Sequence, residues 1–317
     1  MKIIYPPIVS WSMLPQSPHA YCRIFAENGI ETYFMDSNHP AAERHTKKPF
    51  EAQRNLTVLP PDRDPRDYAD TLFFSYPTHV SYAENFDKIL YVLYDYHGDF
   101  LIDKLVKSIE VADIVVAISK KLYNLALSLG CKKSKLLYIP NGLFFDDFMK
   151  EYIKPSILED IKTPIVGYSG VISKEWIDIE VIEDIAKDYS VVCTGSIFDG
   201  ELSDNIYNVG HISNEDFPNF VKSFNVGILP FLDNQFAQHM DPLKFYHYCA
   251  AQIPVLTTNI PAVVNSKVPS YELNKENVEY ALKMDSPQLR GARLHYAKEH
   301  DWKTVLVPLV KRLKELD

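Results

Sequence analysis

The sequence predicts an α/β protein made of two halves of similar size. Its 317 residues suit two domains of roughly 100–200 residues each. Short apolar runs alternate with amphipathic segments, which is typical of α/β units built around a parallel sheet. The alternation stops in residues 142–163, which are rich in Phe, Asp, Lys and Pro, and then restarts. This stretch is therefore the expected linker.

In the first half, apolar runs bounded by polar or turn residues are the expected strands. They are residues 2–11, 30–36, 71–76, 89–94, 113–118 and 136–140. Ser17 is a typical N-terminal cap for a helix over 17–28, which Gly29 ends. Ser119 and Gly130 bracket a second amphipathic helix in the same way.

The second half repeats this alternation. Its expected strands are 164–168, 190–194, 206–209, 226–230 and 254–258. Helices are expected over 214–224, where apolar residues recur at helical spacing, and from Pro242 to about Ala251. Residues 301–316 form a last amphipathic helix, which Pro308 is expected to kink or interrupt.

Composition argues against several functional classes. A net charge of −9 makes nucleic acid a poor partner, because binding it requires phosphate neutralisation. The cysteines form no CxxC pair and the ten histidines lack metal-ligand spacing, so we expect reduced core thiols and no metal. The cysteines are Cys22, Cys131, Cys193 and Cys249. No run reaches the ~18 apolar residues of a membrane span, and the N-terminus is unlike a secretory signal. A cytoplasmic protein is therefore expected.

The most informative stretch is residues 226–258, which reads as strand, loop, helix, strand. Asp241 and Pro242 begin the helix, whose free N–H groups and positive dipole end suit a diphosphate. Lys244 lies in the first turn and shares a helix face with His247, so it could add a contact to phosphate. The alternative is an ordinary amphipathic helix with a solvated Lys244.

A second candidate is the sequence Gly167-Tyr168-Ser169-Gly170, which ends a predicted strand. Two glycines so close together, in a chain with only 11, suggest close approach of the backbone to a ligand. The sequence is not GxGxxG, so no dinucleotide site is expected. A tight turn from strand to helix is the alternative.

A third candidate follows the apolar strand 89–94, where Asp95 comes first and His97, Gly98 and Asp99 follow. Ligands of open α/β sheets bind beyond the carboxyl ends of the strands. A partly desolvated carboxylate there is expected to have a raised pKa and could act as a base or electrostatic stabiliser. The alternative is a cap for a helix over 100–110, which suits Asp99 better than Asp95.

Lysines cluster in the first half and could form a basic face for an anionic membrane or acceptor, although a solvated surface is the commoner explanation. They are Lys104, Lys107, Lys120, Lys121, Lys132, Lys133 and Lys135.

Taken together, these segments resemble the GT-B glycosyltransferases of the family 4 type, especially bacterial polysaccharide-assembly enzymes of the teichuronic-acid and capsule kind. The resemblance rests on YDYHGDF (94–100), LYIPNGLFFDDF (137–148), VGYSGVISKEWIDIEVIEDIA (166–186) and DPLKFYHYCAAQIPVLTT (241–258), which stand in the family's order. It implies two Rossmann-like domains facing across a cleft. Residues 1–155, with a crossing helix over 300–317, would be the acceptor domain, and 163–298 the nucleotide-sugar domain.

The resemblance also implies a function: transfer of a sugar from a nucleotide-diphosphate sugar to a saccharide or lipid-linked acceptor. The nucleotide sugar is a substrate, and neither a cofactor nor a metal would be needed. Asp95, His97 and Asp99 would be the catalytic candidates. The donor-binding candidates would be Gly167, Ser169, Gly170, Lys174, His239, Asp241, Pro242, Leu243, Lys244 and His247.

The chain departs from the family pattern at three positions. His247 stands where the family has the glutamate that binds the ribose, and His239 stands where retaining members have the paired upstream glutamate. Gln252 replaces a glycine that ends the helix in the family. A neutral imidazole accepts one hydrogen bond, whereas a carboxylate accepts several. The sequence is compatible with either retention or inversion of the anomeric configuration. A catalytically weak partner subunit, or a nucleotide-sugar epimerase, are the alternatives to a transferase, and peripheral contact with the inner face of the membrane is a further option.

Overall fold

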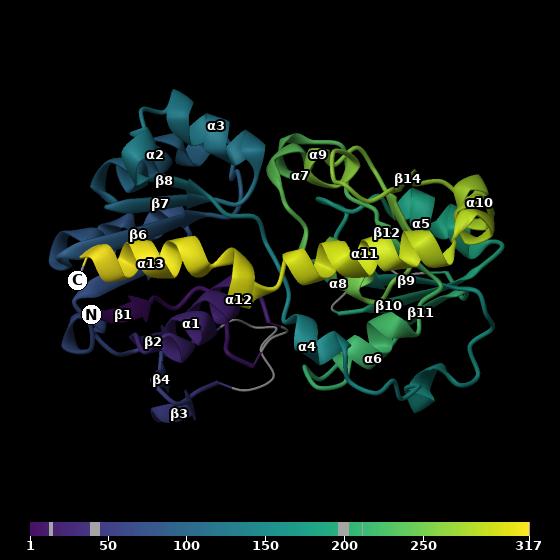
Figure 1. The fold of residues 1–317 in the computed structure, drawn as a ribbon, viewed down its shortest axis with the longest axis horizontal. Helices are drawn as coiled ribbons and strands as arrows, with labels where there is room; N and C mark the ends of the chain where they lie inside the picture. Colours follow the sequence, from purple (N-terminus) through teal and green to yellow (C-terminus); the bar gives the residue numbers. More distant parts are fainter. Residues whose placement is uncertain (13–14, 39–44, 196–202, 211, 317) are drawn as a thin grey trace. The chain divides into compact units, whose positions relative to one another are not determined.

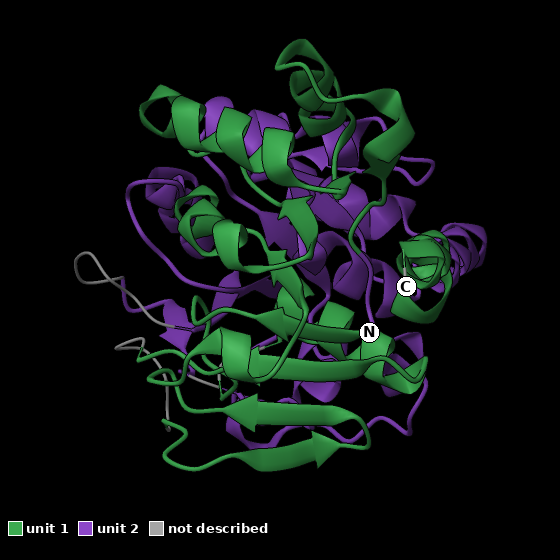
Figure 2. Cartoon of the chain, turned by 90° about the vertical axis from the view of Figure 1, so that its left-hand side faces the viewer, with its two compact units in different colours: residues 1–141, 302–317 green, residues 142–301 purple. Residues whose placement is uncertain are grey.

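The chain forms two compact units in a computed structural model, which describes residues 1–12, 15–38, 45–195, 203–210 and 212–316. Unit 1 is residues 1–141 with 302–317, and unit 2 is residues 142–301 (Figure 2). Each unit has its own sheet and its own helices (Figure 1). The α/β class predicted from the alternation is confirmed in both halves.

The described part of unit 1 contains an eight-stranded sheet in the order β3-β4-β2-β1-β5-β6-β7-β8. Every neighbouring pair is parallel except β3 and β4. The strands are β1 (Lys2–Tyr5), β2 (Glu31–Met35), β3 (Phe50–Gln53), β4 (Leu56–Leu59), β5 (Thr71–Phe74), β6 (Lys88–Leu93), β7 (Ile114–Ala117) and β8 (Leu136–Tyr138). Because the strands are parallel, the residues after β5 and β6 lie at the same edge of the sheet.

The main helices of unit 1 are α1 (Ser17–Glu27), α2 (Ile102–Val111) and α3 (Lys120–Ser128). Ser119 caps α3 as predicted, since its side chain accepts a hydrogen bond from Leu122 N–H. The cap predicted at Ser17 is wrong. The capping residue of α1 is Gln16, whose side chain pairs reciprocally with His19 in a capping box.

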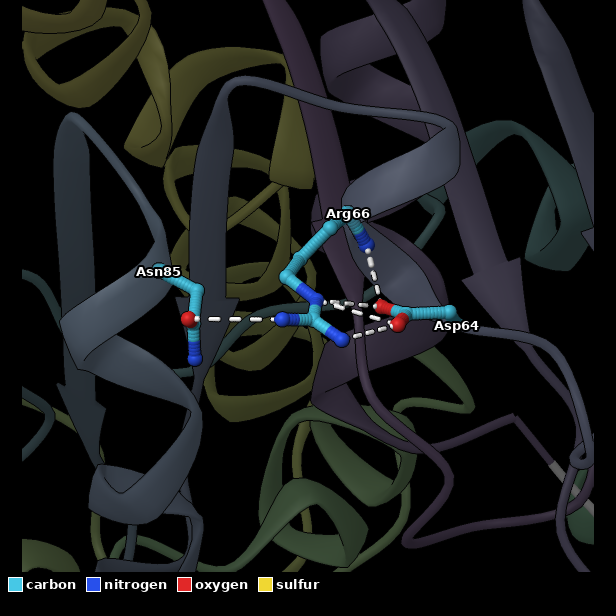
Figure 3. Close-up of polar contacts among 3 residues, drawn as sticks. All are labelled: Asp64, Arg66 and Asn85. Carbon is cyan, nitrogen blue, oxygen red and sulfur yellow. Dashed lines mark hydrogen bonds and ion pairs between the residues drawn. The ribbon is translucent and has the colours of Figure 1, made fainter.

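Short 3-10 turns connect these elements: η1 (Pro65–Asp67), η2 (Pro77–Asn85), η3 (Asp99–Leu101) and η4 (Lys133–Lys135). Arg66 joins η1 to the end of η2 (Figure 3). Its Nε donates to both carboxylate oxygens of Asp64, at 2.8 and 3.0 Å, and its Nη1 reaches Asn85 Oδ1 at 3.5 Å. These groups are exposed, so the contact orients the turns and contributes little to stability.

The predicted C-terminal helix is two helices, α12 (Trp302–Val305) and α13 (Val307–Leu316). Pro308 lies in the first turn of α13, where its missing N–H breaks no helical hydrogen bond. Trp302, Leu309 and Leu313 are buried, and the Trp302 ring meets Tyr21 of α1 at 5.8 Å between centroids. The interruption predicted from Pro308 is therefore confirmed.

Replacing Trp302 by Ala is expected to destabilise the protein by about 3–5 kcal/mol, the usual cost of truncating a buried tryptophan. Chemical denaturation measures this free energy. Lys314→Ala, on an exposed position of the same segment, is the control and should change stability by less than about 0.5 kcal/mol. Equal stability of the Trp302 variant and the control would show that α12 is not part of the unit 1 core.

The described part of unit 2 contains a six-stranded parallel sheet in the order β11-β10-β9-β12-β13-β14. The strands are β9 (Ile165–Ser169), β10 (Ser190–Thr194), β11 (Ile206–Asn208), β12 (Val226–Leu229), β13 (Val255–Thr257) and β14 (Tyr271–Glu272). The helices are α4 (Phe145–Phe148), α5 (Ile179–Ala186), α6 (Phe217–Lys222), α7 (Gln235–His239), α8 (Leu243–Ala250), α9 (Pro261–Val264), α10 (Glu276–Met284) and α11 (Pro287–Glu299), with a 3-10 turn η5 (Ser156–Leu158).

The first chain crossing between the units lies after Asn141, at the start of the predicted linker 142–163 and not at the predicted domain boundary near residue 155. Residues 142–155 belong to unit 2 because their contacts are there. Leu143 N–H donates to the His300 carbonyl at 3.1 Å, and Phe148 is buried in the unit 2 core. These partners are far away in sequence, so a local pattern could not reveal them.

Two glycines let aromatic rings pack on the centre of the unit 2 sheet. Gly167 of β9 and Gly227 of β12 are register partners. A β-carbon at Gly167 would lie 2.0 Å from the Phe224 ring, and one at Gly227 would lie 2.5 Å from the Tyr248 ring. The structure therefore explains Gly167 by packing, and the predicted approach of a ligand at this residue is not needed to account for it.

Replacing Gly227 by Ala is expected to destabilise the fold by at least about 1–3 kcal/mol, the usual range for overpacking a core. The melting temperature measures this change. Gly291→Ala is the matched control, because Gly291 lies in α11 with no heavy atom within 4 Å of its added β-carbon. A melting temperature that stays unchanged in the Gly227 variant would contradict this packing.

Candidate functional site

Polar side chains gather at the carboxyl edge of the unit 2 sheet. Ser169 ends β9 and Thr194 ends β10, and the two are register partners. Both are buried, and within the described chain neither hydroxyl has a hydrogen-bond partner. Buried polar atoms are nearly always paired, so two such hydroxyls side by side point to a polar ligand at this edge. Thr194 was missed in the sequence, although it directly follows an apolar strand run.

Lys244, in the first turn of α8, reaches the same edge. Its Nζ lies 5.4 Å from the Tyr168 ring centroid and 5.5 Å from that of Phe231. A β-carbon at Gly170 would lie only 2.8 Å from this Nζ, and Gly170 has a φ of +150°, so glycine suits this position on both counts.

The ammonium group of Lys244 is half-buried, and no acceptor among the described residues bonds to it. Burial lowers the pKa of Lys244 to about 8. The two aromatic faces are the contacts that favour the charge. A cation placed in this way gains most from an anionic ligand.

The carboxylate of Asp241, at the start of α8, is hydrogen-bonded within the protein. The Tyr246 hydroxyl donates to its two carboxylate oxygens, at 2.8 and 2.9 Å, and the side chain is buried. Asp241 thus holds the start of α8 in place through its hydrogen bonds to Tyr246. Pro242 is the N-terminal cap residue, without a side-chain hydrogen bond, and Leu243 follows as the first helical residue.

His247 lies one turn further along α8, between two aromatic rings. It stacks on Phe148 with 5.6 Å between centroids and an interplanar angle of 13°, and Phe217 meets it edge-on at 5.1 Å. Burial, with the nearby charge of Lys244, lowers the pKa of His247 to about 3, so the ring is neutral. Its Nδ1 is buried and has no hydrogen-bond partner among the described residues.

The other donor-site candidates are less enclosed. His239 ends α7, and its Nδ1 donates to the Gln235 carbonyl at 2.7 Å. Lys174 is exposed. The structure therefore brings together Ser169, Gly170 and Lys244, whereas Lys174 is exposed.

In unit 1, Asp95 lies just beyond β6 at the carboxyl edge of the sheet. It is half-buried and has neither a hydrogen bond nor an ion pair to any described residue. Burial raises the pKa of its carboxyl to about 6, as the sequence led us to expect. The hydroxyls of Tyr91 and Tyr94 are buried nearby, and Asp95 contributes to the raised pKa of both phenols.

His97 and Asp99 differ from each other in their surroundings. The His97 ring meets Tyr76 edge-on at 4.7 Å, and burial lowers its pKa. Asp99 is exposed and accepts a hydrogen bond from the Tyr96 hydroxyl. The alternative that Asp95 or Asp99 caps the next helix is wrong, because Leu101 is the capping residue of α2 and Gly98, with φ of +83°, that of η3.

Another carboxylate at this edge, Asp36 after β2, has a structural role. It accepts hydrogen bonds from the Ser10 hydroxyl and from the N–H groups of Trp11, Ser37 and Thr46, at 2.7 to 2.9 Å. Several donors on one carboxylate lower its pKa despite burial. Asp36 therefore anchors loops, whereas Asp95 is left with free acceptor capacity.

Within the described residues, no helix is long and apolar enough to cross a membrane. The same residues contain no group of three or more His, Cys, Asp or Glu arranged to hold a metal ion.

Comparison with known proteins gives one sequence relative and many structural ones. No family model matches the chain. The relative is the Bacillus subtilis (strain 168) protein named "Putative teichuronic acid biosynthesis glycosyltransferase TuaH", with 25% identity over 185 residues, which is 52% of this chain and 46% of that protein. The chain thus spans about half the length of the curated relative that it matches.

The structural relatives cover nearly the whole chain. HepE of Anabaena, solved in complex with UDP and glucose, aligns over 99% of this chain and 100% of its own, with a TM-score of 0.72 and 11% identity. Sucrose-phosphate synthase from Thermosynechococcus elongatus aligns over 100% and 99%, with a TM-score of 0.73 and 12% identity. An α,α-trehalose-phosphate synthase from Burkholderia vietnamiensis aligns over the same shares, with a TM-score of 0.70 and 10% identity. The chain therefore has the two-unit α/β fold of the GT-B glycosyltransferases.

Proposed function

We propose that this protein is a glycosyltransferase that moves a sugar from a nucleotide-diphosphate sugar to a hydroxyl of a saccharide or lipid-linked acceptor. The proposal rests on the half-buried ammonium of Lys244 and the buried hydroxyls of Ser169 and Thr194, which lie at the same edge of the unit 2 sheet and have no hydrogen-bond partner among the described residues. HepE, which shares the fold, has been solved with UDP-glucose, and the Bacillus relative carries a glycosyltransferase name. These likenesses support the same reading, including a role in bacterial surface polysaccharide assembly.

The donor diphosphate would lie against the start of α8. Lys244 would neutralise its charge, and the N–H groups of the first turn of α8 together with the two hydroxyls would bind its oxygens. Charge that develops on the leaving diphosphate would be stabilised by the same groups, which is why we propose that the chain's own residues perform this step without a metal.

Recognition of the nucleoside would differ from that of the family. Neutral His247 can exchange a hydrogen bond with a ribose hydroxyl through Nδ1, but it cannot accept several as a glutamate does. His239 takes the place of the upstream glutamate of retaining members, and its Nδ1 is occupied by the Gln235 carbonyl.

In the transfer step, a bond forms between the acceptor oxygen and the anomeric carbon, and the bond from that carbon to the diphosphate oxygen breaks. If the configuration inverts, Asp95 would take the proton of the acceptor hydroxyl. If it is retained, Asp95 would orient the acceptor and stabilise positive charge at the anomeric centre. His97 would assist Asp95 in binding the acceptor. Asp99 is exposed and is therefore the weakest of the catalytic candidates.

We also propose cytoplasmic placement with peripheral contact to an anionic membrane face through α2. Phe100 is 80% exposed just before α2, and Lys104 and Lys107 follow on the exposed side of the helix. An exposed aromatic residue beside lysines suits an interfacial contact. Lys135 is not available for this role, since its ammonium donates to the carbonyls of Ile109, Glu110 and Ala112 at the end of α2.

Cosedimentation with vesicles containing anionic lipid tests this contact. Phe100→Ser with Lys104→Gln is expected to lower the bound fraction by about tenfold, since each lysine near an anionic surface contributes about 1 kcal/mol. The matched control is Ile157→Ser with Lys174→Gln, which changes an exposed apolar residue and an exposed lysine of unit 2. Equal vesicle binding by both double variants would show that α2 does not mediate a membrane contact.

The replacement of two carboxylates by His239 and His247 favours one second candidate, a partner subunit that binds nucleotide and stabilises an active transferase. A panel of UDP-, GDP- and dTDP-sugars with and without glycoside acceptors separates the readings. Release of nucleoside diphosphate with a glycosylated product supports the transferase. Nucleotide binding without turnover supports the partner subunit, and interconversion of donor sugars would replace both by an epimerase.

A further inference from the structure

We infer that the reacting end of the acceptor is an uncharged sugar, bound by a subsite made of Tyr76, His79 and His97 beside Asp95. This inference rests on the proposed transferase function and names the substrate class of the same site. It separates a neutral glycoside from two anionic acceptors, a uronic acid and a lipid phosphate.

The three side chains come from two neighbouring connections at one edge of the unit 1 sheet. Strands β5 and β6 are paired in parallel from Thr71 and Lys88 onwards, so the segments that leave them start side by side. Tyr76 follows β5, and its ring meets His97, which follows β6, at 4.7 Å and 80°. His79 N–H donates to the Tyr76 carbonyl at 2.9 Å, and its ring lies 6.4 Å from the Tyr76 ring.

These groups have hydrogen-bonding capacity that suits sugar hydroxyls. Nδ1 of His79 is buried and has no partner among the described residues. Neither His97 nor Asp95 bonds to any described residue. A neutral imidazole offers one donor and one acceptor, as a hydroxyl does. The aromatic rings of Tyr76 and Tyr82, which meets His79 edge-on at 5.5 Å, add apolar surface for the C–H groups of a sugar ring.

The electrostatic surroundings favour an uncharged ligand. Among the described residues, the ring contacts of Tyr76, His79 and His97 are with one another and with Tyr82, and Asp95 makes no ion pair. Burial raises the pKa of Asp95 and lowers those of His79 and His97, which agrees with this absence of a paired cation. An anionic acceptor would bring a second negative charge next to the Asp95 carboxylate without compensation. In unit 2, by contrast, the ammonium group of Lys244 can compensate the negative charge of an anionic ligand.

Matched acceptors that differ only in charge provide the test. The probes are octyl β-D-glucoside, galactoside and mannoside, each paired with its uronic acid, together with farnesyl phosphate. The donor is the nucleotide sugar that gives the highest turnover in the donor panel. For wild type, the best neutral glycoside is expected to exceed its uronic acid and farnesyl phosphate at least tenfold in kcat/KM.

A charge-changing variant makes the test sharper. His97→Lys is expected to raise the ratio of uronide to glucoside kcat/KM at least tenfold, because it supplies the missing cation. His97→Gln keeps a neutral hydrogen-bonding side chain and is expected to keep the wild-type preference. His295→Lys, at an exposed position of α11 in unit 2, controls for added charge alone and is expected to leave the ratio unchanged.

The outcomes distinguish this inference from the function on which it rests. Preference of the wild-type protein for a uronide or for farnesyl phosphate overturns the neutral subsite while the transferase function stands. Absence of donor turnover with every acceptor overturns the transferase function and the inference with it. The wild-type comparison decides even if the His97 variants do not fold.

Discussion

Replacing Asp95 by Asn is expected to lower the transfer rate at least a hundredfold, in line with the 10²–10⁴-fold contribution of a general base. The amide keeps the size of the side chain but removes its charge and basicity. Asp95 is suited to this role because its half-buried carboxylate bonds to no described residue and has a pKa raised to about 6. Affinity for the nucleotide is expected to stay unchanged, because the proposed donor residues all belong to unit 2.

The pH dependence of the rate should identify the same group. A base must be deprotonated, so the wild-type rate should fall as the pH drops below about 6. The Asn variant should lack this decrease. Because the pKa of Asp95 is raised on folding, its ionisation opposes folding, and the stability it contributes at low pH is lost as the pH rises through about 6. The Asn variant should therefore be at least as stable as wild type at pH 7.

Asp99→Asn is the matched control, since Asp99 lies four residues away and is exposed. It should keep a rate within a few-fold of wild type. A well-folded Asp95→Asn protein that turns over at nearly the wild-type rate would end the catalytic assignment.

Replacing Lys244 by Met should weaken binding of the nucleoside diphosphate by about tenfold or more. A hydrogen bond to a charged group contributes about 1.5–3 kcal/mol, and each 1.4 kcal/mol is about a tenfold change in affinity. Methionine keeps an unbranched apolar stem between Tyr168 and Phe231, so packing is largely preserved. Titration calorimetry with UDP, GDP and dTDP measures the loss.

Two further observations test the electrostatic origin of this effect. With a pKa of about 8, the free Lys244 ammonium begins to lose its proton in mildly alkaline solution, so wild-type affinity should fall above about pH 8. Lys162→Met removes an exposed lysine of the same unit that is not a donor-binding candidate, and it should leave affinity nearly unchanged. Undiminished nucleotide binding by the Lys244 variant would place the diphosphate elsewhere.

The sequence was most informative where local pattern decides the structure. Apolar runs located the central strands, and Ser119 predicted the start of α3 because capping depends on adjacent residues. The strand β3 was missed because it is an exposed edge strand without a buried face. The domain boundary was misjudged because residues such as Leu143 are held by His300, more than 150 positions away.

The candidate site shows the same division. Asp95 and Lys244 could be found because one directly follows an apolar strand and the other lies in the first turn of a helix. The packing role of Gly167 and the buried hydrogen bonds of Asp241 could not be found, since they depend on Phe224 and Tyr246. The subsite of Tyr76, His79 and His97 depends on which strands are neighbours, which the sequence pattern alone did not establish.

The most direct test of the account is mass spectrometry of a neutral glycoside acceptor after incubation with the protein and each nucleotide sugar of the panel. We expect an acceptor heavier by one sugar residue, formed together with one equivalent of nucleoside diphosphate. The Asp95→Asn and Lys244→Met variants should form this product more slowly than wild type. An acceptor of unchanged mass with every donor, from a folded protein that binds nucleotide, would contradict the account.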